Sequence, residues 1–328
     1  MTLRLTIDER RWQAHVDEVR TSVTGLTPVV KGNGYGIGRA ALSERALAWS
    51  RVLVMGTVHE ALQHRRIADE QVLVLTPAVR PVALPAWVVP TVGRPEHLDA
   101  VAGHRGAVAV KLRSSMNRYG TDPEGLAALL RLLDERARPV HAALLHLPLP
   151  GVREGPAGGG PLGGPLDGLL DEVEAWLPHV PVKVPVSVSH VDATAMATLR
   201  ERHPDRTFQV RLGTALWHGD KSFLQVQADV IDVHPVRAGA RVGYRATTVA
   251  GDGTLVMVGA GSSHGIAPLD GGRSPFHFRR ARIALVEAPH MHTSMCWVPQ
   301  GQPAPEVGDW VDVQRPLIAV TADEVVWS

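Results

Sequence analysis

Short runs of apolar residues alternate with longer segments of helical periodicity over the first two thirds of the chain. The helical pattern is plainest in "DPEGLAALLRLLDERA", where Leu126, Leu129, Leu130 and Leu133 recur at the spacing of one buried helix face. Such patterns predict helices over residues 59–67, 123–136, 166–177 and 193–202. The apolar runs between them predict eight strands, over residues 28–31, 51–58, 71–75, 87–92, 107–112, 140–147, 184–189 and 208–212.

Most of these eight runs are continuously apolar rather than alternating. Continuous apolar runs are typical of parallel strands that are buried on both faces. Parallel strands that alternate with helices eight times predict an α/β fold of the (β/α)8, TIM-like barrel type, with a doubly wound sheet as the main alternative. We assign residues 1–224 to this barrel domain.

The pattern changes after about residue 224. Short valine-rich runs such as "VQADVIDVHPV", "TLVMVGAG" and "DWVDVQ" are separated by Gly, Pro and Asp. No segment there has a convincing helical periodicity. We therefore predict a separate, mostly antiparallel β domain over residues 225–328.

One segment, "PGVREGPAGGGPLGGPLDG" (residues 150–168), is rich in Gly and Pro, which oppose regular structure. It follows the sixth predicted strand, at the end of a barrel where active sites form. The sequence predicts a loop there, and whether this loop is an active-site lid stays open.

Composition narrows the class of protein. The chain has 328 residues, 45% hydrophobic and 20% charged, as in an ordinary soluble globular protein. Its formal net charge is +1 and no basic stripe with interleaved aromatic residues occurs, so we expect no nucleic-acid partner. The sequence contains no run of about 18 apolar residues and no apolar core of signal-peptide length. We therefore expect no membrane association. The only cysteine is Cys296, which excludes an internal disulfide and favours a cytoplasmic location.

The stretch "TPVVKGNGYGIG" (residues 27–38) sets Lys31 between an apolar run and a glycine-rich turn. The chain has 34 basic residues but only four lysines, and only lysine can lose its proton near neutral pH and form a Schiff base. In a barrel, Lys31 would lie at the C-terminal end of the first strand. Other strand ends would bring "KLRSSMNRYG", "LLHLP", "VSVSH" and "VRLGTALWHG" to the same mouth.

These segments give the chain a resemblance to the alanine racemase family. "VVKGNGYGIG" resembles the family's V-K-A-N-A-Y-G-H-G, "KLRSSMNRYG" resembles K-x-D-T-G-M-x-R-L-G, and "VRLGTALWHG" resembles V-R-P-G-I-x-L-Y-G. The similarity runs from about residue 5 to residue 260. It implies a pyridoxal 5'-phosphate (PLP) enzyme of fold type III, with a barrel and a C-terminal β domain, that acts on a small amino acid as a head-to-tail homodimer.

The resemblance also implies roles for individual residues. Lys31 would hold PLP as a Schiff base and serve as one of two proton-transfer bases at the substrate Cα. Tyr35 would reach the cofactor phosphate from the glycine-rich turn. The backbone of Gly213 and Thr214 would hold the same phosphate.

Two positions stay open between alternatives. Ser189 is our choice for a phosphate-binding hydroxyl, but "VSVSHVDA" matches the family's N-S-A-A poorly, so Ser187 or His190 could be the counterpart. His146 matches the barrel histidine that packs beneath the cofactor ring. An ordinary core histidine with satisfied hydrogen bonds is the alternative.

Basic residues would set the charge around the cofactor. Arg211 matches the family arginine that faces the pyridine nitrogen, and because guanidinium keeps its proton, that nitrogen would stay unprotonated. Arg118 matches the arginine that contacts the cofactor's phenolic oxygen and the substrate carboxylate. Lys111 has the position of a lysine that is carbamylated in many members. Whether it is carbamylated here stays open, because Arg113 adds positive charge beside it.

The C-terminal domain departs from the family. The tyrosine of the family's G-Y-A-D-G motif, which is the second base, is absent from "VMVGAGSSHGIAPL". His264 in this loop is the candidate replacement, since imidazole titrates near neutrality. Met295 remains from the family's S-M-D motif and would contact the substrate, but Cys296 stands in place of the aspartate. Tyr244 is another phenol that could reach a partner's site.

The sequence thus predicts an isomerase that interconverts L- and D-alanine or the enantiomers of another small amino acid. Because the second base is altered, we keep two alternatives, which are one-sided PLP chemistry at Cα, such as decarboxylation, and a PLP-binding protein without turnover. His290 and His292 share one face of an extended segment but lack a third ligand, so we predict no metal site.

Overall fold

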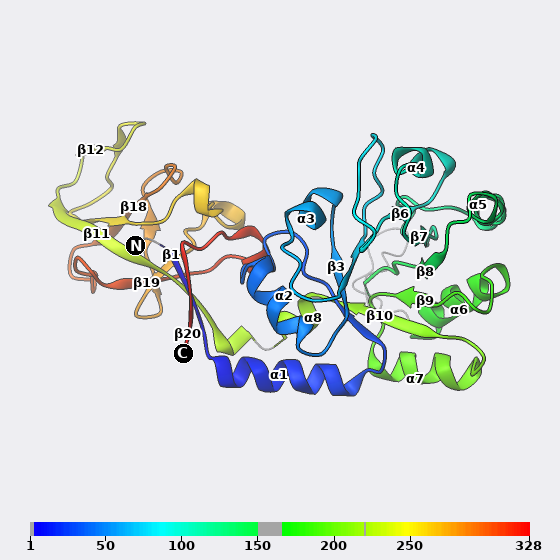
Figure 1. Ribbon diagram of the computed structural model, residues 1–328. Helices are drawn as coiled ribbons and strands as arrows, with labels where there is room; N and C mark the ends of the chain where they lie inside the picture. Colours follow the sequence, from blue (N-terminus) through cyan, green and yellow to red (C-terminus); the bar gives the residue numbers. More distant parts are fainter. Residues whose placement is uncertain (1–2, 150–165, 220) are drawn as a thin grey trace, which may run out of the picture. The chain divides into compact units, whose positions relative to one another are not determined.

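The computed structural model describes residues 3–149, 166–219 and 221–328. The fold separates into two compact units (Figure 1). The barrel unit comprises Val16–Gly34 and Arg39–Trp217. The C-terminal unit comprises Met1–His15, Tyr35–Gly38 and His218–Ser328.

The strands of the barrel unit form two hydrogen-bonded groups, and every pairing within them is parallel. The larger group has the order β2 (Leu26–Pro28), β10 (Phe208–Leu212), β9 (Val186–Val188), β8 (Val140–Leu144), β7 (Val108–Lys111) and β6 (Thr91–Val92). The smaller group has the order β3 (Val52–Met55), β4 (Gln71–Val74) and β5 (Val88–Val89).

Two junctions close these groups into one ring. Val29 forms a parallel bridge with Val54, which joins the end of β2 to β3. β5 and β6 are the halves of one predicted strand and flank Pro90, which has no N–H for a ladder hydrogen bond. The carbonyl of Pro90 still accepts a hydrogen bond from Ala109 N at 2.9 Å. With β5 and β6 counted together, eight strands form the ring, and the predicted (β/α)8 barrel is confirmed.

Local sequence explains where the helices begin. α5 (Pro123–Glu135) starts after Asp122, whose Oδ1 accepts a hydrogen bond from Gly125 N at 2.9 Å, and proline takes its first position. Of the predicted leucine face of α5, Leu126, Leu129 and Leu133 are buried and Leu130 is partly buried. The other helices are α1 (Glu9–Ser22), α2 (Arg39–Leu47), α3 (Val58–Gln63), α4 (Pro95–Ala100), α6 (Leu166–Trp176), α7 (Ala193–Arg202) and α8 (Thr214–Trp217).

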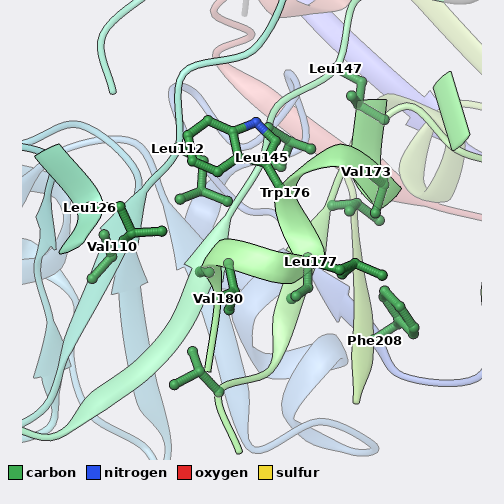
Figure 2. Close-up of a cluster of buried hydrophobic side chains, with 14 of the residues drawn as sticks. Val110, Leu112, Leu126, Leu145, Leu147, Val173, Trp176, Leu177, Val180 and Phe208 are labelled. Atoms are coloured by element: carbon green, nitrogen blue, oxygen red, sulfur yellow. The ribbon is translucent and has the colours of Figure 1, made fainter. Parts of the chain in front are cut away.

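The core of the barrel unit lies where helices pack on strands. Figure 2 shows part of this cluster, in which Val110 of β7 and Leu126 of α5 lie with Val173 and Trp176 of α6. Burying one such aliphatic side chain contributes about 1.5–3 kcal/mol. This packing fixes the strands whose C-terminal ends carry the predicted site residues.

The C-terminal unit is built on one mostly antiparallel sheet, as predicted, with the main order β16-β15-β19-β11-β14-β18-β17. Its longest strand, β11 (Leu224–Val236), pairs antiparallel with β14 (Gly253–Val258) and with β19 (Trp310–Val313). The remaining strands are β12 (Arg241–Val242), β13 (Thr247–Thr248), β15 (Phe276–Phe278), β16 (Ala281–Arg282), β17 (Ala284–Leu285), β18 (Ser294–Pro299) and β20 (Glu324–Trp327).

The N-terminal strand corrects the predicted division of the chain. The sequence assignment placed all of residues 1–224 in the barrel domain, but β1 (Leu3–Ile7) belongs to the C-terminal unit. β1 pairs antiparallel with β11 and parallel with β20. Leu3, Leu5 and Ile7 are buried in alternation, as expected for a strand with one face in a core.

The prediction of a loop over residues 150–168 is for the most part not tested by the structure. Residues 150–165 of it lie outside the described residues, so the active-site lid stays a prediction. Leu166–Trp176 is helical (α6), within the helix predicted over residues 166–177. Among the described residues, no helix combines the length and the apolar character needed to cross a membrane.

Candidate active site

A cavity at the mouth of the barrel brings much of the predicted chemistry together. Lys31 follows β2, Gly56 follows β3, Lys111 ends β7 and Arg211 lies in β10. The lining residues are Lys31, Gly56, Leu75, Thr76, Lys111, Ser114, Arg118, Tyr119, His146 and Arg211. Four of these ten side chains are lysine or arginine, and none of the ten carries a carboxylate. The cavity therefore suits an anionic ligand.

A larger cavity, of about 600 Å³, lies between α2 and α3 and has none of the predicted site residues in its lining. One of its arginines, Arg39, donates from Nη1 to Gly32 O at 2.6 Å and from Nη2 to Gln63 Oε1 at 2.8 Å. Arg39 thus supports the backbone that follows Lys31. We place the chemistry in the smaller cavity, where the candidate residues meet.

The turn after Lys31 repeatedly takes the left-handed backbone conformation. Gly32, Gly34 and Gly36 have φ values of 66°, 64° and 85°. Tyr35 between them has φ of 56°, which is uncommon for a residue with a side chain. Glycine adopts such angles without steric cost, which explains the alternation of glycines in "KGNGYGIG".

The surroundings of Lys31 lower the pKa of its amine. Burial is the largest cause, and the positive charges of Arg118 and Arg211 act in the same direction, whereas Glu60 opposes them. A lowered pKa increases the fraction of free amine at neutral pH. The free amine is the form that attacks an aldehyde.

Arg211 is held in the cavity wall by buried hydrogen bonds. Its side chain is only 4% exposed, and Nη1 donates to Ser187 O at 2.5 Å and to Ser187 Oγ at 2.8 Å. Nη2 donates to Leu145 O at 2.9 Å. Burial lowers the pKa of Arg211 to about 10, so the guanidinium stays charged at neutral pH.

Lys111 is buried beside two arginines. It ends β7, and burial first, then the charges of Arg211 and Arg118, lower its pKa to about 6. The amine is therefore largely neutral at pH 7. Arg113, expected to add charge beside Lys111, instead pairs with Asp122 at 2.9 Å on the exposed side of the turn.

A tight turn carries Arg118 and Tyr119 to the cavity. Thr121 N donates to Lys111 O at 2.8 Å and closes the turn back onto β7. Gly120 has φ of 148°, and a Cβ there would lie 2.7 Å from backbone atoms of the neighbouring segment. Only glycine fits this position, which fixes the directions of the two side chains before it.

His146 and Ser189 face each other across neighbouring strand ends. Ser189 Oγ and His146 Nδ1 lie 2.6 Å apart, and the rings of His146 and His190 are 4.6 Å apart between centroids. Burial, with smaller contributions from nearby positive groups, lowers the pKa of His146 to about 3. His146 is thus a neutral imidazole that lines the cavity. His190 Nδ1 contacts Leu147 O at 2.7 Å and so has a backbone partner.

The predicted phosphate-binding residues are not among the lining residues of the cavity. Thr214 begins α8 directly after β10, and Gly213 O accepts the first hydrogen bonds of that helix. Trp217 Nε1 donates to Val29 O at 2.7 Å, which ties α8 to the strand before Lys31. Gly213, Thr214 and Ser189 do not belong to the lining set given above. Tyr35 belongs to the C-terminal unit, so its contact with a phosphate stays a prediction.

His264 is bound into the C-terminal unit. It is 6% exposed, its Nδ1 accepts a hydrogen bond from Gly261 N at 3.0 Å, and its Nε2 lies 3.2 Å from Asp323 Oδ2. An imidazole whose Nδ1 accepts a backbone proton must carry its own proton on Nε2, facing the carboxylate. The geometry therefore opposes the predicted role of His264 as the second base, because no lone pair of the ring is available.

The other candidate site residues of the C-terminal unit differ in how exposed they are. Cys296 is completely buried in β18, and burial raises the pKa of its thiol, so it is not a reactive nucleophile. Met295 precedes it and is half-buried, and its contact with substrate stays a prediction. Tyr244 is 87% exposed, and its ring lies 4.5 Å from the ring of His290. No group of three His, Cys, Asp or Glu side chains suited to a metal occurs in the described ranges.

Five lining residues were missed by the sequence analysis, namely Gly56, Leu75, Thr76, Ser114 and Tyr119. Tyr119 had a visible signal, because it occupies the place of leucine in the motif that "KLRSSMNRYG" resembles. The other four follow strands or turns and carry no sequence signal beyond their position.

Comparison with known proteins agrees with this geometry. A family model described as alanine racemase, N-terminal domain, matches residues 7–220. Alanine racemase 2 of Clostridium acetobutylicum is 23% identical over 273 residues, which is 74% of this chain and 66% of that protein. The chain therefore spans just under two thirds of that curated relative.

Solved structures show the same fold. Alanine racemase from Bartonella henselae, with covalently bound pyridoxal phosphate, has a TM-score of 0.75 at 18% identity and covers 100% of both chains. Alanine racemase from the D-cycloserine producer Streptomyces lavendulae has a TM-score of 0.71 at 18% identity, covering 100% of this chain and 97% of that one. At these identities the likeness establishes the architecture only.

Proposed function

Because the chain belongs to the alanine racemase family, as its match over residues 7–220 shows, we propose that it is a PLP-dependent racemase of alanine or another small amino acid. The observation that carries this proposal is the cavity at the barrel mouth. It combines a lysine of lowered pKa with Arg118, Arg211 and Lys111, and none of its described lining residues is acidic.

The residues present fit a phosphorylated, aldehyde-bearing cofactor. When bound, PLP supplies an electron-withdrawing ring that stabilises negative charge at the substrate Cα. Lys31 Nζ is the amine that would bind the aldehyde carbon. Ser189, Gly213, Thr214 and Tyr35 remain our candidates for the phosphate, on the resemblance of their motifs.

The fixed arginines would set the electronic character of the site. Arg211 cannot rotate away, since three acceptors hold its guanidinium, and it would keep the pyridine nitrogen unprotonated. Arg118 is exposed at the cavity and would bind the substrate carboxylate. A cation there offsets the negative charge that develops as the α-proton leaves.

Lys31 would also move a proton. Once substrate replaces it on the cofactor, the free amine is the base that takes or returns a proton at one face of Cα. The proposal includes a homodimer, in which Met295 of the C-terminal unit would approach substrate.

Reconstitution with PLP tests the proposal. The wild-type protein should show the visible absorption of a cofactor bound through an amine and should incorporate deuterium at Cα of both alanine enantiomers in heavy water. Lys31→Ala should lose both signals. Lys183→Ala is the matched control, because Lys183 is an exposed lysine outside the cavity lining. An absorption band that persists in Lys31→Ala would contradict the proposal.

A second candidate function is one-sided chemistry at Cα, such as decarboxylation. Its support is that His264 is engaged on both ring nitrogens and Cys296 is fully buried. The same exchange experiment separates the two functions, because one-sided chemistry labels a single enantiomer. A cofactor band without any exchange would indicate a PLP-binding protein without turnover.

A further inference from the structure

Racemisation needs proton-transfer groups on both faces of the substrate Cα, and only Lys31 has so far been assigned. The candidates in the C-terminal unit are weak as bases, because the His264 ring is occupied and Cys296 is buried. The barrel cavity itself contains further groups that can exchange a proton, namely Lys111, Tyr119 and His146.

Two of these three groups have a physical obstacle. The pKa of His146 is lowered to about 3, and its Nδ1 is bonded to Ser189 Oγ, so it remains neutral at neutral pH. Lys111 is 7% exposed, and a protonated amine there would be a further positive charge beside Arg118 and Arg211. Of the two lysines in the lining, Lys31 is exposed and Lys111 is buried, so Lys111 is the less accessible to substrate.

Tyr119 lies beside Arg118 in the lining of the cavity. Its ring lies under the guanidinium of Arg118, with the Arg118 Cζ atom 5.2 Å from the ring centroid. The phenol is the remaining proton-exchanging group of this lining, in which Arg118 and Arg211 also lie.

The hydroxyl of Tyr119 is placed for exchange rather than locked into the fold. It lies 3.5 Å from Leu75 O, which is a long contact compared with an ordinary hydrogen bond of about 2.7–2.8 Å for this pair of atoms. Leu75 lines the cavity as well, so the hydroxyl is at the cavity wall. The turn closed at Gly120 holds the ring there.

We propose that Tyr119 Oη is the second proton-transfer group, supplied by the same subunit that supplies Lys31. The motif resembled by "KLRSSMNRYG" has leucine at this position, so the phenol is a property of this chain. The inference rests on the proposed racemase function and names the residue that completes it.

The proton balance is simple. In one direction Lys31 Nζ takes the proton as the Cα–H bond breaks, the electron pair stays on Cα, and Tyr119 Oη gives its proton to the opposite face as the new Cα–H bond forms. In the other direction the phenolate takes the proton and the Lys31 ammonium returns one. Exchange with water restores both groups, and no oxidant or reductant takes part.

Tyr119→Phe in the PLP-loaded enzyme tests the inference. Racemisation should fall by about 10²–10⁴, the usual contribution of a general acid or base. Exchange of the Cα proton in heavy water should persist for the one enantiomer that Lys31 deprotonates, without inversion. Tyr244→Phe removes the other candidate phenol, which is 87% exposed and outside the lining of the barrel cavity, and the inference expects this variant to keep the wild-type rate.

A binding measurement excludes a purely structural role. Titration of the apo-protein with PLP should give a Kd for Tyr119→Phe within about threefold of the wild type, and the two thermal midpoints should agree. A Kd weakened to the same extent as the racemisation rate would make the hydroxyl a cofactor ligand and overturn the inference.

The possible failures are distinguishable. If the wild type racemises and Tyr119→Phe keeps its rate, the inference falls while the proposed function stands. If Tyr244→Phe rather than Tyr119→Phe loses racemisation, the second group comes from the C-terminal unit and the inference is again overturned. If the wild type shows neither a cofactor band nor Cα exchange, the proposed function fails and this inference with it.

Discussion

The barrel mouth and the C-terminal unit carry the family pattern to very different degrees. At the mouth, Lys31, Arg118 and Arg211 match the family motifs, and the structure gathers them around one cavity. In the C-terminal unit, His264 and Cys296 stand where proton-transfer and polar residues were expected. The structure shows both of them serving the fold, through a buried hydrogen-bond network and through apolar packing.

This difference teaches that a motif position can keep its place in the chain while its chemistry is lost. Cofactor binding needs charges fixed at strand ends, and the barrel supplies these from within one unit. A second base needs only a proton-exchanging group on the other face of Cα, so any element at the cavity can supply it. The predictions below test whether the chemistry resides in the barrel and the stability in the C-terminal loops.

The largest expected effect is that of Arg211→Ala. Its removal takes the Arg211 donor from Leu145 O and Ser187 Oγ, whereas Ser187 O keeps the hydrogen bond from Leu145 N, and each buried acceptor left unsatisfied costs about 1–3 kcal/mol. We expect the free energy of unfolding in urea to fall by roughly 3 kcal/mol or more, and PLP binding to weaken as well.

Arg202→Ala is the control for that substitution. Arg202 makes a surface ion pair with Glu174 at 3.3 Å, with half of its side chain exposed. Such pairs contribute about 0–1 kcal/mol, so this variant should unfold nearly like the wild type. Equal losses from the two variants would contradict the structural role given to Arg211.

Lys111 should make stability depend on pH. Its pKa is lowered from the model-peptide value of 10.5 to about 6 in the folded state, so the unfolded chain binds more protons between these values. The free energy of unfolding should therefore rise with pH from about 6 upward. Lys111→Met should remove this slope and stabilise the protein at pH 7 by roughly 2 kcal/mol, because no buried amine then needs to be kept neutral.

Denaturant titrations at pH 6, 7, 8 and 9 measure this slope. The advantage of Lys111→Met over the wild type should be largest at the lowest pH and shrink toward the highest. If the stability advantage of Lys111→Met over the wild type grew with pH, the lowered pKa of Lys111 would be contradicted. If Lys111 is carbamylated, added bicarbonate should stabilise the wild type and leave Lys111→Met unchanged.

His264→Gln should affect stability rather than chemistry. The substitution disturbs the contacts with Gly261 N and Asp323, and we expect a loss of about 1–3 kcal/mol in the free energy of unfolding. The racemisation rate per folded molecule should stay within about threefold of the wild type. A rate loss of a hundredfold in a stable His264→Gln protein would restore this residue as the second base.

The smallest effect is expected at Cys296. Because the thiol is fully buried and its pKa is raised, a thiol reagent should react with it only after unfolding. Cys296→Ala should cost about 1 kcal/mol from the lost packing. Rapid labelling of the folded protein, with loss of racemisation, would instead place this cysteine in the chemistry.

The barrel could be predicted from sequence because its signals are local. Most of the parallel strands are continuous apolar runs. Asp122, Pro123 and the spacing of the leucines predict α5. The predicted positions at strand ends follow from the same periodicity. Lys31, Lys111, His146 and Arg211 therefore lie together as the alternation of strands and helices requires.

The remaining features depend on partners that are distant in sequence. β1 is a short alternating strand whose place is set by its pairing with β11 and with β20. Both partners are more than 200 residues away in the sequence, and β20 lies near the C-terminus. The burial of His264 depends on Asp323, which no local pattern connects to it. Tyr119 was not predicted because the comparison with the motif looked for residues that match it. Tyr119 differs from the motif, which has leucine at this position.

The central claim is that Lys31, among the four lysines of the chain, holds the cofactor. Borohydride reduction of the PLP-loaded protein fixes the cofactor to the amine that holds it, and mass spectrometry of the peptides then locates the label. We predict a single pyridoxyl group on Lys31. A label on Lys111, Lys183 or Lys221, or no label at all, would contradict the account.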